Sequence, residues 1–161
     1  MGRLSLANAP IAAQDIITRH QVDAPVPVGA IARDLNVKVV ISDLPLAVSG
    51  TLSRNQDDDG WTIRVNRHEH KNRQRFTIAH EIAHYVLHRD VIGSELVDDT
   101  FYRSGLSERR EFEANALAAD ILMPWPLIRR LMNEGVNSST DLAMALEVSP
   151  AAMSIRLGLP T

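Results

Sequence analysis

The stretch RFTIAHEIAHYVLH, residues 75–88, carries the pattern H-E-x-x-H inside an apolar run. Residues four positions apart lie one turn above each other on the same face of an α-helix. A helix here would therefore direct the imidazoles of His80 and His84 toward one metal ion. Glu81 is rotated by about 100° from His80, which lets its carboxylate reach a water molecule beside that ion. The run predicts a buried helix that carries the metal site of a zinc hydrolase.

The apolar neighbours of the motif separate this interpretation from a chance match. A chain of this length with 6 histidines contains H-E-x-x-H by chance in about one case in a hundred. Two imidazoles and a carboxylate buried in an apolar helix cost free energy unless they share a polar partner. We therefore interpret His80, Glu81 and His84 as a zinc site rather than as ordinary core residues.

Composition limits the classes of protein that fit. A length of 161 residues with 45% hydrophobic and 23% charged residues is typical of one soluble globular domain. The absence of cysteine excludes disulfides, cysteine zinc sites and thiol nucleophiles. A net charge of −3 gives no basic footprint for nucleic acid. The segment from Met1 to Ala13 is too broken for a signal peptide, and no run suits a membrane span, so we expect a cytoplasmic protein.

The rest of the chain predicts an α+β fold with a helical, zincin-like core. Two short helices precede a small three-stranded antiparallel sheet beside the metal helix, and a free edge of such a sheet can hold an extended peptide as a further strand. The helices are expected over residues 11–20 and 28–35, and the strands over residues 37–42, 49–54 and 61–66. An irregular, acidic segment over residues 91–105 is expected to form a surface loop, which could act as a lid.

The C-terminal part predicts further helices. The tail over residues 141–157 resembles a helix-turn-helix, but its second helix carries only Arg156, so packing or partner binding is favoured over DNA binding. We expect a metallopeptidase domain over residues 1–125 and a C-terminal helical segment over residues 126–161 packed on it. The two parts could also form one continuous domain.

Two histidines require a third protein ligand to make a catalytic zinc site. A metzincin would place a histidine at the position that Asp90 occupies. His88 would lie too far along one straight helix to share the ion and is expected to be a neighbour of the site. The remaining source is a carboxylate from the following helix, where Glu111 and Glu113 stand 27 and 29 residues after His84. Periodicity alone does not separate the two.

Two blocks together resemble the ImmA/IrrE family of bacterial and phage metallopeptidases. They are RFTIAHEIAH, residues 75–84, and EFEANALAADILMP, residues 111–124. The E-A-N element of the family falls on Glu113, Ala114 and Asn115, so the resemblance implies Glu113 as the third ligand, in the manner of gluzincins. Leu117 and Ala83 stand where the family usually has Phe and often has Gly.

The resemblance implies a zinc-dependent metalloendopeptidase with one Zn²⁺ ion held by His80, His84 and Glu113, and with Glu81 as general base. The candidates for the second hydrogen-bond donor to the oxyanion are His88, Tyr102 and an arginine, and the sequence does not choose between them. The expected substrate is an Xre-type helix-turn-helix repressor of mobile-element or stress genes. The alternative is the toxin component of a toxin–antitoxin pair, which acts by binding an Xre-type antitoxin. A DNA-binding regulator is the least favoured, and neither a membrane nor a direct nucleic-acid partner is expected.

Overall fold

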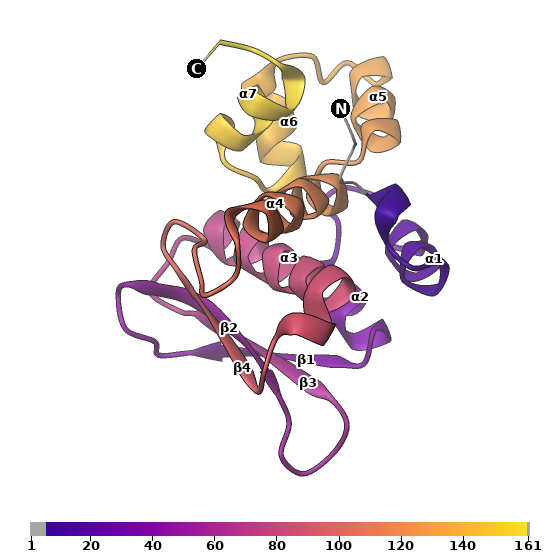
Figure 1. The fold of residues 1–161 in the computed structure, drawn as a ribbon. Helices are drawn as coiled ribbons and strands as arrows, with labels where there is room; N and C mark the ends of the chain where they lie inside the picture. Colours follow the sequence, from indigo (N-terminus) through magenta and orange to yellow (C-terminus); the bar gives the residue numbers. More distant parts are fainter. Residues whose placement is uncertain (1–5, 161) are drawn as a thin grey trace.

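The computed structural model describes residues 6–160, and its helices are stacked in layers on one face of a sheet (Figure 1). Helix α3 lies on the sheet, α4 crosses above α3, and α5, α6 and α7 lie beyond α4 (Figure 1). The expectation for the segment from Met1 to Ala13 concerns in part residues 1–5, which lie outside the described residues. The elements are η1 (Leu6–Asn8), α1 (Ile11–Arg19), α2 (Val28–Asp34), β1 (Val37–Ser42), β2 (Val48–Arg54), β3 (Trp61–Asn66), α3 (Lys71–His88), η2 (Arg89–Val91), β4 (Glu95–Asp99), α4 (Glu108–Leu122), α5 (Trp125–Asn133), α6 (Ser139–Leu146) and α7 (Pro150–Leu157).

The sheet has four strands in the order β1-β3-β2-β4, and it is mixed rather than antiparallel. Strand β2 pairs antiparallel with both β3 and β4, whereas β1 pairs parallel with β3. The predicted three-stranded antiparallel sheet was therefore wrong in two respects. The chain reverses between β1 and β2 and again between β2 and β3, so β1 lies beside β3 and runs in the same direction. The fourth strand, β4, comes from the segment that was expected to be a loop.

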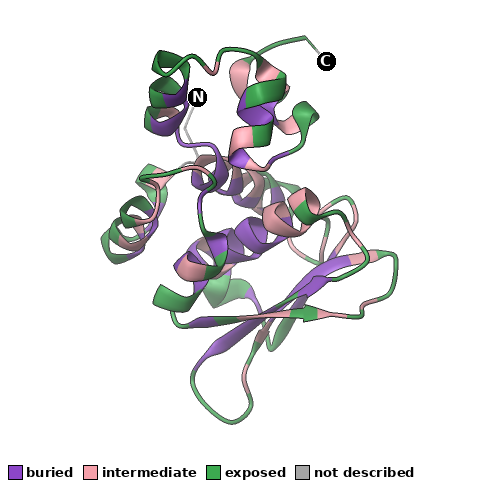
Figure 2. Ribbon diagram, turned by 180° about the vertical axis from the view of Figure 1, so that it is seen from behind, coloured by how far each residue is buried: buried purple, intermediate pink, exposed green. Residues whose placement is uncertain are grey.

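Helix α3 is the centre of the molecule. The side chain of its N-cap residue, His70, accepts a hydrogen bond from the backbone N–H of Asn72 at 3.0 Å. Every residue from Thr77 to His84 is buried, because the sheet covers one side of the helix and α4 covers another (Figure 2). A helix buried on all sides normally carries apolar residues only. The polar residues of the H-E-x-x-H motif therefore lie in the interior of the protein.

The sheet approaches α3 most closely at Gly50 of β2. A Cβ atom on Gly50 would lie 2.5 Å from Thr77 Cγ2 and 3.0 Å from the backbone oxygen of Arg64. We expect Gly50→Ala to lower the free energy of unfolding by about 1–3 kcal/mol, because the extra methyl group must push α3 from the sheet. Urea denaturation measures this. The control is Gly29→Ala in α2, where a Cβ meets nothing within 4 Å; equal stability of the two variants would contradict the prediction.

The C-terminal helices are held to α4 by side chains. Arg156 of α7 forms an ion pair with Asp120 of α4 at 2.8 Å and donates a hydrogen bond to the backbone oxygen of Met123 at 3.0 Å. Its guanidinium also lies over the ring of Trp125. The one cation that α7 carries is thus used in packing, in line with the packing role favoured for the tail. In the described part of the chain, no helix is long and apolar enough to cross a membrane.

Candidate metal centre

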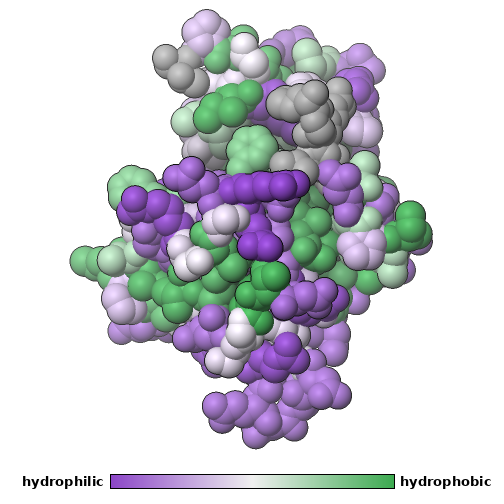
Figure 3. All heavy atoms as spheres, viewed as in Figure 1, coloured by the Kyte–Doolittle hydropathy of each residue, from purple (hydrophilic) through white to green (hydrophobic). Residues whose placement is uncertain are grey.

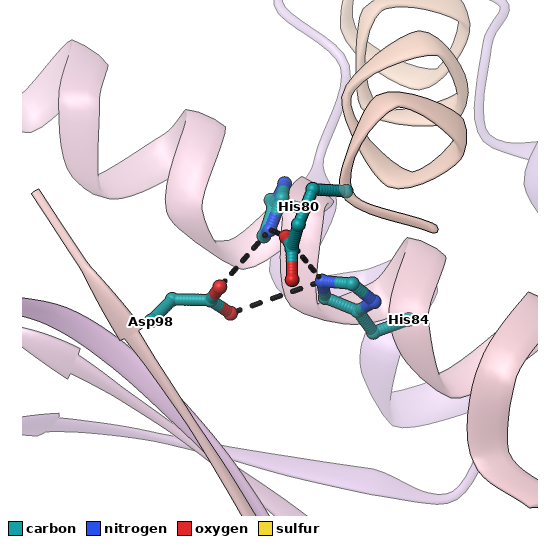
Figure 4. A group of neighbouring side chains, drawn as sticks. His80, His84 and Asp98 are labelled. Carbon is teal, nitrogen blue, oxygen red and sulfur yellow. Dashed lines mark hydrogen bonds and ion pairs between the residues drawn. The ribbon is translucent and has the colours of Figure 1, made fainter. Parts of the chain in front are cut away.

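Four side chains from three elements meet between α3, α4 and the sheet. His80 and His84 come from α3, Glu111 from α4 and Asp98 from β4, and Figure 4 shows Asp98 directed toward the two imidazoles. Glu111 Oε1 lies 3.3 Å from His80 Nε2 and 3.1 Å from His84 Nε2. One ligand atom from each of the four residues lies within 4.8 Å of the others. The cluster therefore offers two imidazole nitrogens and two carboxylates to one point.

The polar atoms at this point lack the partners that buried groups need. His80 Nε2 and both carboxylate oxygens of Glu81 and of Asp98 are buried without a hydrogen-bond partner in the structure. Unpaired buried polar and charged groups cost several kcal/mol each. Metal–donor bonds of about 2.0–2.1 Å in a tetrahedral site place neighbouring donors about 3.4 Å apart. Because the donor distances around Glu111 Oε1 are close to this value, the residues fit a divalent cation.

Glu113, the ligand that the sequence resemblance implied, does not join this cluster. Its Oε1 accepts a hydrogen bond from His88 Nε2 at 2.7 Å, and its Oε2 lies 3.3 Å from Arg109 Nε. Residues two positions apart on a helix are rotated by about 200°, so Glu111 and Glu113 cannot face the same point. In this structure Glu111, and not Glu113, is the carboxylate of α4 that faces His80 and His84.

Outer hydrogen bonds fix the two imidazoles. His80 Nδ1 donates to Asn115 Oδ1 at 2.9 Å. His84 Nδ1 lies 3.0 Å from His88 Nδ1, and His88 passes its other N–H to Glu113. Both metal-facing histidines therefore hold their ring protons on Nδ1 and turn Nε2 toward Glu111, as metal-binding histidines usually do. His88 orients His84 and is not free to serve as an oxyanion donor.

The Asn115 contact gives a direct test of this arrangement. We expect Asn115→Ala to weaken metal binding by about 10–100-fold, because His80 loses the acceptor that fixes its tautomer and ring orientation. Competition with a chelator of known affinity measures the change. Asn115→Asp keeps an acceptor oxygen at the same place and should retain most of the affinity. An alanine variant with wild-type affinity would show that Asn115 does not orient the ligand.

Charges inside the cluster shift the ionisation of its members. Burial lowers the pKa of His80, but contacts with Asp98 and Glu111 outweigh it and raise the pKa to about 9. Burial raises the pKa of Glu111, but hydrogen bonds from His80 and the other partners of its carboxylate lower it to about 2. Burial, together with the negative charge of Asp98, holds the pKa of Glu81 well above its usual range. A metal ion entering the cluster must displace the proton of His80 and favours the ionised form of Glu81.

The other expected oxyanion donors are already engaged. The Tyr102 hydroxyl hydrogen-bonds Thr77 Oγ1 at 2.9 Å, and the Tyr102 ring lies 4.8 Å from the His80 ring. Arg73 donates to the backbone oxygen of Thr100, and Arg75 donates to the backbone oxygen of Val26 at 2.8 Å. Of these candidates, Tyr102 is the one whose ring touches the cluster.

An apolar cavity of about 630 Å³ adjoins the cluster. Phe76 and Tyr102 belong to both, since each packs against the His80 ring and lines the cavity, and Asn115 also contacts both. The remaining lining residues come from the start of α3, from α4 and the residue that follows it, from α7 and from the turn before α7. They are His70, Asn72, Arg73, Ala119, Met123, Val148, Ser149, Pro150, Ala151, Ala152 and Ile155. A larger hollow of about 790 Å³ around Trp61 shares no lining residue with the cluster.

Comparisons with known proteins place the chain among metallopeptidases. Residues 32–158 match the family model of the IrrE N-terminal-like domain, a family of metallopeptidases. The chain is 32% identical over 99 residues to the radiation response metalloprotease IrrE of Deinococcus radiodurans. The aligned segment covers 60% of this chain and 30% of that protein. A Mycobacterium tuberculosis transcriptional regulator has a similar fold, with a TM-score of 0.62 and 20% identity over 92% of this chain and 46% of the regulator. The chain thus spans less than half the length of either relative.

Proposed function

The chain belongs to the IrrE N-terminal-like, or ImmA/IrrE, family of metallopeptidases, and from this premise we propose that it is a zinc-dependent metalloendopeptidase. The observation that carries the proposal is the convergence of His80 Nε2, His84 Nε2 and Glu111 Oε1 beside the buried Glu81. We assign the two histidines and Glu111 as metal ligands. Two imidazoles with one carboxylate are a donor set typical of catalytic zinc, although other divalent metals also accept it.

In the proposed mechanism, Glu81 moves the proton. Its carboxylate lies one position from His80 on α3, and it is buried with no hydrogen-bond partner of its own. It can therefore take a proton from the attacking water and deliver it to the leaving amine. The metal, when bound, supplies Lewis-acid activation of water and of the scissile carbonyl. Asn115 and His88 keep the two imidazoles in place, and burial of the site excludes bulk water.

The substrate edge of the sheet differs from the one expected from the sequence. Strands β2 and β3 are each paired on both sides, so neither offers a free edge, and β4 is the terminal strand next to β2. An extended peptide could add to β4 as a further strand. Val97 of β4, Phe101 after it and Phe112 of α4 have exposed apolar side chains, which supports this. Figure 3 shows apolar surface in the region where Figure 1 draws β4. The cavity beside His80 suits a large apolar side chain next to the scissile bond.

The proposed protein substrate is an Xre-type helix-turn-helix repressor, as the family resemblance implies, with derepression of mobile-element or stress genes as the result. The test is to incubate the zinc-loaded protein with the candidate repressor and with a peptide library, and to identify fragments by mass spectrometry. We expect cleavage that a chelator abolishes, with large apolar residues enriched beside the cut. A stable complex without fragments would instead favour the toxin-type binding partner.

A further inference from the structure

Asp98 is a buried carboxylate that the proposed mechanism does not use. It lies on β4 with its side chain fully buried, and neither of its oxygens has a hydrogen-bond partner. Oδ1 lies 3.5 Å from His80 Nε2, and Oδ2 lies 3.9 Å from His84 Nε2 (Figure 4). Its ionisable neighbours are thus the two histidines that we assign to the metal and Glu81, whose pKa the negative charge of Asp98 raises. A carboxylate in this position needs a cation to offset its burial.

We propose that Asp98 is a fourth protein ligand, which closes the metal site in the resting protein; the proposal rests on the metallopeptidase function above. The donor atoms support it. The distances from His80 Nε2 to Glu111 and to Asp98 are 3.3 Å and 3.5 Å, which bracket the edge of about 3.4 Å expected for a tetrahedral zinc site. The distance from His84 Nε2 to Asp98 is 3.9 Å, and one donor atom from each of the four residues lies within 4.8 Å of the others, so Asp98 is within reach of the same metal ion.

The ring protons of the histidines leave both Nε2 atoms directed at a cation that Asp98 also reaches. Asn115 takes the Nδ1 proton of His80, and His88 pairs with Nδ1 of His84. In the neutral rings that bind metals, both Nε2 atoms then present lone pairs to the carboxylates. Lone pairs facing carboxylate oxygens need a cation between them, either the proton that the metal-free His80 keeps or a bound metal ion. The outer hydrogen bonds of the site thus prepare it for a metal that Asp98 also reaches.

The sheet is irregular at the point where Asp98 enters the site. The pairing of β2 with β4 shifts register between Val48 and Gly50, which face Asp99 and Asp98. A bulge of this kind turns the strand locally and re-aims a side chain, and bulges are frequent next to active sites. Asp98 shares its inward direction with Leu96, whereas Val97 between them faces outward. The extra residue, Ser49, lies on β2, whereas β4 keeps a regular alternation that turns Leu96 and Asp98 to the same side.

Four protein ligands have a functional consequence. Structural zinc sites are closed by four protein ligands, whereas catalytic sites keep one position open for water or substrate. A metallopeptidase closed by Asp98 is latent until this carboxylate leaves. Because Asp98 is carried by the terminal strand β4, a polypeptide that pairs with β4 acts on the strand that holds the fourth ligand. Substrate docking and opening of the metal site would then be one event.

The test uses Co²⁺ in place of zinc, since its visible absorption spectrum reports the coordination of the metal without any cleavage assay. We expect Asp98→Ala to bind one Co²⁺ per chain with a changed spectrum and an affinity reduced by more than the 10–100-fold typical of outer-shell residues. Asp98→Asn keeps the shape of the side chain, so it should show a similar spectral change in a protein of native stability. The control is Asp99→Ala, whose side chain binds the turn at Phe101 and Arg103 instead.

The outcomes separate this proposal from the proposed function. If the spectrum and affinity of both Asp98 variants match those of the wild type, Asp98 is not a ligand, even if the protein cleaves its substrate. If the spectrum changes but no polypeptide is cut by any form of the protein, the ligand assignment stands and the peptidase function fails. If the protein is a peptidase whose resting state is closed by Asp98, the Asp98→Ala protein should cleave a short peptide faster than the wild type at saturating zinc.

Discussion

Glu111→Ala is expected to abolish stoichiometric zinc binding, whereas Glu113→Ala should keep one zinc ion per chain. The reason is geometric. Glu111 Oε1 lies 3.1 Å and 3.3 Å from the two histidine nitrogens, and its side chain is largely buried. Glu113 reaches the site only through His88, so its loss removes an outer hydrogen bond, which typically costs about 10–100-fold in affinity. Elemental analysis of the purified variants and titration with zinc measure both effects.

The control for this pair is Glu108→Ala, which removes an exposed carboxylate from the first turn of the same helix. It should leave the metal content unchanged. Circular dichroism must show that each variant is folded, because a misfolded chain would also lose metal. Loss of zinc from the Glu113→Ala protein, with zinc retained by Glu111→Ala, would contradict the structure and restore the assignment that the resemblance implied.

The two glutamates of α4 show how far residue spacing along one helix can predict the metal site. His80, Glu81 and His84 lie on one helix, so the 3.6-residue period fixes their relative directions. The carboxylate comes from a second helix, whose rotation about its own axis is set by packing. A signal for this rotation was nevertheless present in the sequence. Glu111 continues the buried stripe of α4, which runs through Ala114, Leu117, Ala118 and Ile121.

In the sheet, one strand could not be predicted from its local sequence. Strands β1, β2 and β3 were predicted from their β-branched and alternating residues, and the structure confirms their existence. The acidic sequence of β4, ELVDD, disfavours a strand on propensity, so the segment was expected to be a loop. Pairing with β2 over residues 95–99 overrides that propensity, which is a non-local effect. Asp98 was missed for the same reason. Because no strand was predicted over residues 95–99, the alternation of inward and outward side chains could not be used to identify Asp98 as buried.

Glu81→Gln is expected to reduce cleavage by about 10²–10⁴-fold while the protein keeps its zinc. An amide has the shape of the carboxylate but cannot take the proton from water. Metal binding should persist because the cluster of donor atoms consists of His80, His84, Glu111 and Asp98, without Glu81. Initial rates of fragment formation and the zinc content of the same sample separate the two effects. Glu108→Gln, an exposed change in the first turn of α4, is the matched control.

Stability gives the Glu81→Gln experiment a second, independent readout. Glu81 is completely buried, its oxygens lack partners, and the negative charge of Asp98 adds to the cost of its ionised form. If Glu81 stabilised the fold, its replacement would lower the free energy of unfolding. If Glu81 serves catalysis at the expense of stability, its replacement should raise that free energy or leave it unchanged. We therefore expect the metal-free Glu81→Gln protein to be at least as stable as the wild type in urea. Cleavage at the wild-type rate would remove Glu81 as the base, and a marked loss of stability would point to a structural role.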